Sequence, residues 1–153
     1  MFSLELLGGA TLGDERGPVS GPAVQRHRLA LLALLAVAPG GKTSRDRLVA
    51  LLWPESGEAA ARRLLNVSLH ALRKQLGEDA LLSLADDVQV RPGALPSDVG
   101  RFRAALEAGE HRAAVDLYAG PFLHGFHLGG AGEFDRWAEG VRDGLARAHQ
   151  EAL

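Results

Sequence analysis

The stretch from Trp53 to Gly77, WPESGEAAARRLLNVSLHALRKQLG, constrains the fold of this chain more than any other. Pro54 cannot continue a preceding helix, and Glu58 places a negative charge where the dipole of a new helix favours one. With Ser56 as the candidate N-cap, the pattern predicts a helix from Gly57 to Leu76. A helix that stops, a tight turn and a second helix follow one another in the order of a helix-turn-helix motif.

The predicted helix has one apolar face and one basic face. At 100° per residue, four leucines fall within about 40° of one line, which makes an apolar stripe for a core. The other faces carry Arg62, Arg63, Asn66, His70, Arg73 and Lys74, and no acidic residue lies between positions 59 and 76. Such a face can neutralise phosphates and place donors at base edges in a major groove. Taken alone, a basic face is more often an ordinary solvated surface.

Composition and charge are those of an ordinary folded protein with a local basic bias. The chain has 153 residues, of which 46% are hydrophobic and 24% charged, enough for one good core or two small ones. Residues 1–92 hold 11 Lys/Arg against 10 Asp/Glu, whereas residues 93–153 hold 6 against 9. Within the first half, positive charge is concentrated in residues 23–49 and in the predicted helix, as an electrostatic footprint for nucleic acid requires.

The cellular compartment is predicted from what the sequence lacks. There is no cysteine, which excludes a disulfide framework and a thiolate-bound metal and fits a reducing interior. The start of the chain has no basic region typical of a secretory signal, and the leucine-rich run Leu29 to Val37 is too short to span a bilayer. We therefore expect a cytoplasmic protein.

The predicted elements of the first 92 residues follow the order of a winged helix. Ser3 to Leu7 alternates apolar and polar residues and, with the short Gly/Pro-bounded segments Thr11 to Leu12 and Pro18 to Ala23, predicts a small antiparallel sheet. Gln25 to Ala38 is apolar on nearly every face and predicts a buried central helix, and Ser44 is the candidate N-cap of a second helix. Leu81 to Pro92 predicts a β-hairpin. In a winged helix the third helix enters the major groove and the hairpin can flank it.

The second half of the sequence is predicted to be helical. Pro92 to Pro96 is a candidate joint, which divides the chain into a winged-helix domain over residues 1–92 and a helical domain over residues 97–153. Ser97 or Asp98 is expected to cap one helix, and Glu110 to Ala119 forms the next, so the two make an antiparallel hairpin of the tetratricopeptide-like kind. The predicted fold class is therefore α+β in the winged helix, with its three helices and wing, followed by an all-α domain.

The last predicted helix, Glu133 to Leu153, has an apolar stripe and no helix after it to cover that stripe. The stripe consists of Phe134, Trp137, Val141 and Leu145. Exposed apolar patches usually mark interfaces. The sequence therefore predicts a docking or dimerisation surface on this helix, with a second copy of the chain as one partner.

Two motifs resemble those of the bacterial antibiotic-regulatory-protein (SARP) family of transcriptional activators. ALLWPESGEAAARRLLNVSLHALRKQLG, Ala50 to Gly77, is similar to the signature of the family's winged helix. VDLYAGPFLHGF, Val115 to Phe126, followed by EFDRWAEGVRDGL, Glu133 to Leu145, resembles the bacterial transcriptional activator domain that comes after it. Weaker matches at Leu4 to Gly9 and Arg26 to Ala36 extend the resemblance over nearly the whole chain.

The resemblance implies binding to double-stranded promoter DNA at direct repeats and contact with RNA polymerase subunits. It places Arg62, Asn66, Arg73 and Lys74 on positions of the recognition helix that are usually basic or amide-bearing in the family. Because members usually extend well beyond 153 residues, two alternatives follow. The chain is either a short member or the N-terminal part of a longer regulator, in which case the helical domain is truncated.

The candidate DNA-binding residues fall into two groups. Arg62, Arg63, Asn66 and His70 are expected at base edges, because recognition helices usually touch bases with their N-terminal half and middle. The amide of Asn66 can bind adenine N6 and N7 with two hydrogen bonds, while Arg73, two turns further on, is expected to hold a phosphate. Lys74 on the same helix is a further candidate. The candidates for positioning phosphates outside this helix, each of which is at least as well explained by a solvated surface charge, are Arg26, His27, Arg28, Lys42, Arg45 and Arg47.

Two alternative functions stay open at this point. The acidic hairpin tip Asp86-Asp87 and the near-neutral net charge fit a protein-interaction adaptor that uses the winged helix only as a scaffold. His124 and His127, with Glu133 nearby, prompt a metal-dependent enzyme, but two histidines in a Gly-rich loop are weak evidence, since metal ligands usually lie on rigid elements. We therefore expect no enzymatic activity, no metal and no cofactor.

Overall fold

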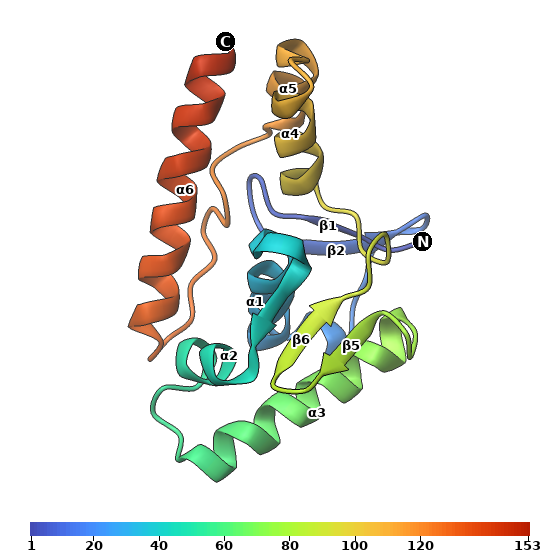
Figure 1. Ribbon diagram of the computed structural model, residues 1–153, viewed down its shortest axis with the longest axis vertical. Helices are drawn as coiled ribbons and strands as arrows, with labels where there is room; N and C mark the ends of the chain where they lie inside the picture. The colour runs from blue at the N-terminus through green and yellow to red at the C-terminus, as the bar shows by residue number, and fades with distance from the viewer.

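Two small antiparallel sheets and six α-helices form the structure, a computed structural model that describes residues 1–153. The first sheet has the order β1 (Ser3–Glu5), β2 (Thr11–Asp14), β3 (Gly17–Pro18), and the second has the order β4 (Lys42–Ser44), β6 (Asp87–Val90), β5 (Leu81–Leu84). The helices are α1 (Arg26–Val37), α2 (Arg45–Leu52), α3 (Glu58–Leu76), α4 (Asp98–Glu107), α5 (His111–Leu117) and α6 (Gly132–Ala152). In Figure 1, α3 lies across the lower end of the molecule, α4 and α5 form the upper end, and α6 runs along one side.

The first half has the predicted winged-helix order, with α1, α2 and α3 followed by the hairpin β5–β6. Ser44 caps α2 as expected, because its Oγ accepts the backbone N–H of Arg47 at 3.1 Å. Ser56 does not cap α3. The N-cap is Gly57, without a side-chain hydrogen bond, and the helix begins one residue later than predicted, at Glu58.

Two short elements beside the winged helix were not predicted correctly. Lys42–Ser44 forms strand β4, which pairs antiparallel with β6 so that Thr43 lies opposite Val88. In the N-terminal sheet, the expected strand from Pro18 to Ala23 is reduced to the two residues of β3, and Pro22–Val24 is instead a 3₁₀ turn. A three-residue strand carries too little alternation to be recognised without its partner.

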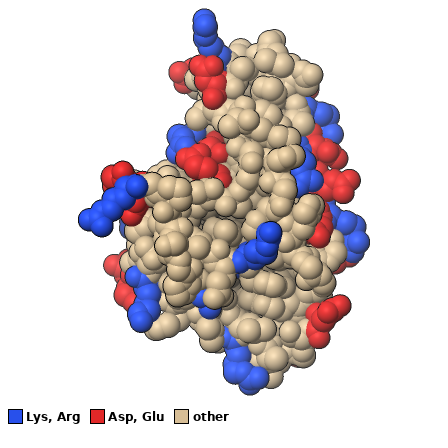
Figure 2. Space-filling model, turned by 180° about the vertical axis from the view of Figure 1, so that it is seen from behind, with Lys and Arg blue, Asp and Glu red and all other residues tan.

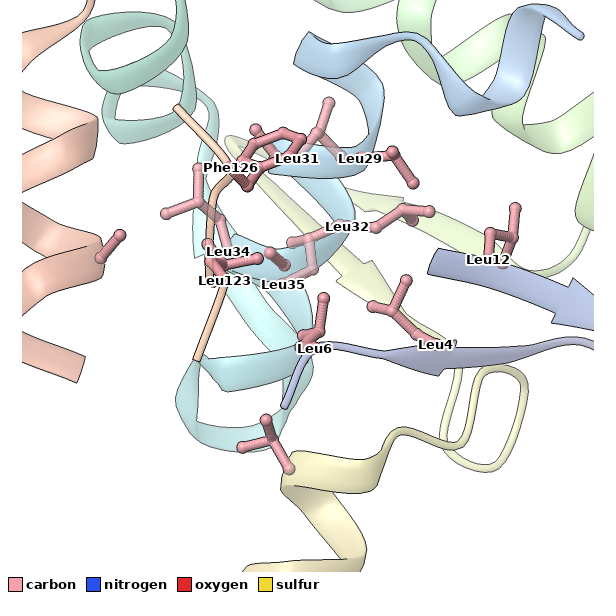
Figure 3. Close-up of a cluster of buried hydrophobic side chains, with 14 of the residues drawn as sticks. Leu4, Leu6, Leu12, Leu29, Leu31, Leu32, Leu34, Leu35, Leu123 and Phe126 are labelled. Atoms are coloured by element: carbon pink, nitrogen blue, oxygen red, sulfur yellow. The ribbon is translucent and has the colours of Figure 1, made fainter. Parts of the chain in front are cut away.

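Helix α1 lies at the centre of the core, as its apolar sequence predicts. Its residues from Ala30 to Leu35 are at most 4% exposed. Figure 3 shows leucines of α1 facing Leu4 and Leu6 from the N-terminal strand region, while Leu123 and Phe126 approach from a loop of the second half. The buried hydrophobic side chains of both halves, from Leu4 in the first to Leu145 in the second, form one cluster of 33 residues.

The predicted joint between the halves is built into this core. Leu95 is 9% exposed, and the backbone N–H of Leu4 donates to the carbonyl of Pro96 at 2.9 Å. A second link joins Leu123 N–H to the carbonyl of Leu6 at 2.8 Å. The segment is therefore not a free linker, although the boundary between residues 92 and 97 stays a prediction.

A close backbone approach explains why position 120, in the segment VDLYAGPFLHGF, is a glycine. A Cβ at Gly120 would lie 3.1 Å from the Cα of Gly8, which is tighter than almost all real side-chain contacts. Gly8 has a φ of 108°, a conformation that side chains rarely adopt. The two glycines let the N-terminal strand region and the loop after α5 pack directly together.

The apolar stripe of α6 is mostly covered within the chain, so the prediction of an exposed stripe was wrong. Phe134 is 0% exposed and Leu145 4%, while Trp137 and Val141 are half-buried. The loop after α5 supplies the cover, since the Phe122 ring lies 5.8 Å from the Trp137 ring and Phe126 lies 6.3 Å from Phe134. Sequence order had suggested that only a later helix could cover α6, but an earlier loop does so.

Helices α4 and α5 pack against each other, and α6 packs against α5 and α2. Ser97 is the N-cap of α4, with its Oγ accepting the Gly100 N–H at 3.0 Å. The tetratricopeptide-like character of this half stays a prediction. None of the six helices combines the length and apolar composition that crossing a membrane would require.

Candidate nucleic-acid interface

The outer face of α3 is exposed, basic and partly apolar. Leu65, Leu69 and Leu72 anchor the inner face, each at most 1% exposed. The outer face presents Arg63, Val67, His70 and Lys74, with Val67 54% exposed, and its neighbour Leu64 is 40% exposed. No carboxylate lies within ion-pair distance of Arg63 or Lys74. These two cations are therefore available to an external anion.

Arg62 has a partner on its own helix. Its Nη2 lies 2.7 Å from Oε1 of Glu58, one turn earlier, and both side chains are more than half exposed. Exposed pairs of this kind contribute about 0.3–0.5 kcal/mol. Arg62 can consequently exchange this carboxylate for a phosphate or a base at little cost.

A side-chain network joins α2, α3 and the wing, which we define as the hairpin β5–β6. Arg45 donates from Nη1 to Oδ1 of Asn66 at 3.1 Å and from Nη2 to Oγ of Ser83 at 3.0 Å. Arg73 donates from Nη2 to the same Ser83 Oγ at 3.0 Å and from Nε to the carbonyl of Leu81 at 3.0 Å. The structure thus brings together Arg45, Asn66 and Arg73, which the sequence had placed in one interface without contact between them. Ser83 was missed, because nothing in the alternation of a short strand distinguishes a serine that binds two arginines.

The start of α1 was expected to add phosphate contacts, and its three basic residues point to different places. Arg26 lies over the Phe126 ring, 5.1 Å from its centroid, and donates to the carbonyl of His127 at 3.4 Å. His27 stacks on the Trp53 ring. Only Arg28, held by the Pro22 carbonyl at 2.7 Å, lines the same hollow as His70 and Lys74 of α3.

Lys42 and Arg47 are exposed and lie at a second hollow, of about 360 Å³, which also has Trp137 of α6 in its wall. The wing tip carries the exposed Asp86, whose carbonyl accepts the backbone N–H of Arg45 at 2.8 Å.

On the face seen in Figure 2, Lys and Arg are scattered, many have Asp or Glu near them, and much of the surface is uncharged. The face in this view carries no broad basic surface, and the candidate interface rests on α3 and its immediate surroundings.

The two loop histidines do not assemble a metal-ligand set. His127 Nδ1 lies 3.9 Å from Oδ1 of Asp135, and both His124 and His127 are exposed. No group of three or more His, Asp or Glu side chains is placed to hold a metal ion.

Comparison with known proteins gives a relative in sequence and a relative in structure. No family model matches the chain. An "uncharacterized 47.3 kDa protein in thcA 5′region" of Rhodococcus erythropolis is 36% identical over 141 residues, which cover 92% of this chain and 28% of that protein. The chain thus spans little more than a quarter of the length of this curated relative.

The structural relative is EmbR of Mycobacterium tuberculosis, solved in complex with a low-affinity phosphopeptide. It superposes with a TM-score of 0.71 at 24% sequence identity, over 97% of this chain and 43% of EmbR. At this level of identity the similarity shows the fold. The shared fold covers nearly the whole chain and includes the winged-helix order α1, α2, α3 and the hairpin β5–β6.

Proposed function

We propose that the chain is a sequence-specific DNA-binding transcription regulator that inserts α3 into the major groove of promoter DNA. The observation that carries this proposal is the outer face of α3, where Arg63 and Lys74 have no carboxylate partner although the rest of the helix is firmly anchored in the core. A rigid helix with unpaired cations and the wing beside it suits groove insertion and phosphate neutralisation.

The apolar side chains on α3 support the proposal as well. Val67 lies between Arg63 and His70 along the outer face and is 54% exposed, and Leu64, one helical turn before it, is 40% exposed, so the two present a small apolar surface beside the cations. In the major groove, thymine offers a C5-methyl group that apolar side chains contact. Val67 and Leu64 would therefore lose water-exposed area on DNA and add to sequence preference.

The helical half is assigned by the resemblance to SARP activators. We propose that α4, α5 and α6 belong to a tetratricopeptide-like activator domain. The protein would bind direct repeats and activate transcription by contacting RNA polymerase. It would act in the cytoplasm as a non-enzymatic protein without a cofactor. Because much of the α6 stripe is buried, a second copy of the chain would have to use another surface. Adjacent operator repeats can bring two copies together without a pre-formed dimer.

A charge-matched comparison tests DNA binding through α3. Arg63→Gln with Lys74→Gln removes the two unpaired cations of the outer face, and Arg112→Gln with Arg147→Gln removes two exposed cations from α5 and α6. Fluorescence anisotropy with a labelled duplex at low salt should show at least about a tenfold loss for the first pair. The second pair should bind like wild type. Equal effects of the two pairs would mean that only net charge matters and that α3 is not the interface.

The adaptor remains the second candidate, favoured by the acidic wing tip and by the use of Arg45 and Arg73 inside the protein. Asp86 would lie near a phosphate backbone if the wing flanked the DNA, and like charges in contact are unfavourable. An adaptor would show no binding to duplex DNA even at low salt. The same anisotropy titration therefore separates the two functions.

A further inference from the structure

The hydrogen bond between Arg45 and Asn66 fixes which way the Asn66 amide points. The bond joins Arg45 Nη1 to Asn66 Oδ1 at 3.1 Å, across 21 positions of sequence. A guanidinium group has only N–H donors and no acceptor, so the amide must turn its oxygen toward Arg45. The exposed NH₂ group of Asn66 is left with two donors for an external partner.

Arg45 is itself held in place, so this orientation is built into the fold. Its Nη2 donates to Ser83 Oγ at 3.0 Å, and its backbone N–H donates to the Asp86 carbonyl at 2.8 Å. No carboxylate lies within ion-pair distance of its guanidinium group. The guanidinium group of Arg45 therefore stays beside Asn66, and the pair presents hydrogen-bond donors to whatever lies against it.

This pattern matches guanine. In the major groove, adenine presents one acceptor, N7, and one donor, the N6 amino group, whereas guanine presents two acceptors, N7 and O6. An asparagine reads adenine with one acceptor and one donor, but the oxygen of Asn66 is turned toward the Arg45 guanidinium group, so the part of the amide without a partner in the chain is its NH₂ donor. We infer that Arg45 and Asn66 form a guanine-reading pair, with Asn66 in contact with the base and Arg45 as the residue that positions it. The inference rests on the proposed function, and it replaces the adenine contact expected from the sequence.

The surroundings of the pair are compatible with a G·C base pair. Asn66 and Arg45 line a hollow of about 240 Å³ between α2 and α3, together with Arg62, Asp46 and Asp86. Arg62 adds further donors to the guanine side. Carboxylates only accept hydrogen bonds. The donor that a G·C pair offers in the major groove is the cytosine N4 amino group, which a carboxylate can bind.

The test is selection of bound sequences from random duplex DNA by the full chain and three variants. Wild type should enrich guanine at one position that depends on Asn66, and Asn66→Ala should lose the preference at that position only. Arg45→Ala frees the amide to present its oxygen, so the preferred base there should change from guanine to adenine. Arg47→Ala removes an exposed arginine of the same helix that makes no side-chain contact with Asn66, and it should keep guanine. Circular dichroism establishes that each variant is folded.

A chemical substitution in the DNA gives a second arm. Replacing the selected guanine by 7-deazaguanine removes the N7 acceptor and should weaken wild-type binding by about 5-fold or more, while binding of Asn66→Ala should be unchanged. Selection of adenine by wild type at the Asn66-dependent position would overturn the inference and leave the proposed function intact. So would an Arg45→Ala variant that binds all sequences more weakly with the same base preference, since Arg45 would then be a phosphate contact. If wild type enriched no sequence at all, the proposed function would fail together with the inference.

Discussion

The carboxylate of Asp98 accepts the backbone N–H of Leu6 at 2.8 Å, although 92 residues separate them. Its second oxygen accepts the N–H of Leu7, also at 2.8 Å, and the side chain lies in a residue that is only 3% exposed. A single buried side chain therefore ties the N-terminal strand region to the start of α4. This contact makes the two halves of the chain dependent on each other for stability.

Asp98→Ala should remove this link and leave three buried N–H groups, those of Leu6, Leu7 and Val99, without their side-chain partner. Each buried unsatisfied donor costs about 1–3 kcal/mol, so we expect a loss of about 3 kcal/mol or more in the free energy of unfolding. Urea denaturation followed by circular dichroism measures it, with Asp116→Ala as an exposed control on α5. An Asp98→Ala variant as stable as the control would show that the contact contributes nothing net.

Glu5 should give the stability of the protein a specific pH dependence. Burial and, after it, the nearby charge of Asp98 raise the pKa of Glu5, against the opposing effect of Arg101. A carboxyl whose folded-state pKa is raised contributes most to stability at acid pH, and this contribution is lost as the pH rises through the folded pKa. The difference in melting temperature between Glu5→Gln and wild type should therefore shift in favour of Glu5→Gln as the pH increases above 4.5, the ordinary pKa of Glu. A constant difference between pH 4 and pH 7 would contradict the raised pKa.

The ring of Trp53, at the end of α2, stacks on His27 at the start of α1. The centroids are 5.5 Å apart and the planes 7° from parallel. Because the residue is half-buried, Trp53→Ala should cost about 1–3 kcal/mol rather than the 3–5 expected of a fully buried ring. A double-mutant cycle with His27→Ala should give a coupling of about 0.5–1.5 kcal/mol. Additive effects of the two changes would mean that the stack is incidental.

Arg73 and Lys74 should behave differently although they are neighbours on α3. Arg73 binds Ser83 and the Leu81 carbonyl, so Arg73→Ala should destabilise the fold by about 1–3 kcal/mol and leave the salt dependence of DNA binding nearly unchanged. Lys74 is exposed, so Lys74→Ala should keep the stability and lower the log–log salt slope by about one unit. If instead Arg73→Ala lowered the salt slope and left the stability unchanged, Arg73 would be the phosphate contact expected from the sequence.

How far the sequence could predict the fold depended on how local the determining interactions were. The three helices of the winged helix and the wing depend on periodicity, caps and turn residues that lie within a few positions, and these were predicted to within one or two residues. Strand β4 depends on its pairing with β6 more than forty positions later, which no local pattern contains. The cover over Phe134 and Leu145 likewise comes from an earlier loop that looked only Gly-rich in sequence.

The candidate site shows the same division. The exposed positions of Arg63, His70 and Lys74 follow from the angle each residue takes around the helix, which the sequence gives directly. The contacts of Arg45 and Arg73 do not, because a helical projection gives the direction of a side chain and not its partner. Ser83, which receives both arginines, becomes recognisable only when the wing is folded against α3.

The central claim is that this protein binds duplex DNA through the cations around α3, and the salt dependence of binding tests it most directly. Each phosphate contact that releases a counterion adds about 0.9 to the slope of log affinity against log salt concentration. Arg62, Arg63 and Lys74 of α3, with Arg28 beside them, predict a slope magnitude of about 4 per bound chain. The measurement is an anisotropy titration of one labelled duplex at several salt concentrations. A slope near 1, or no binding at low salt, would contradict the claim and favour an adaptor.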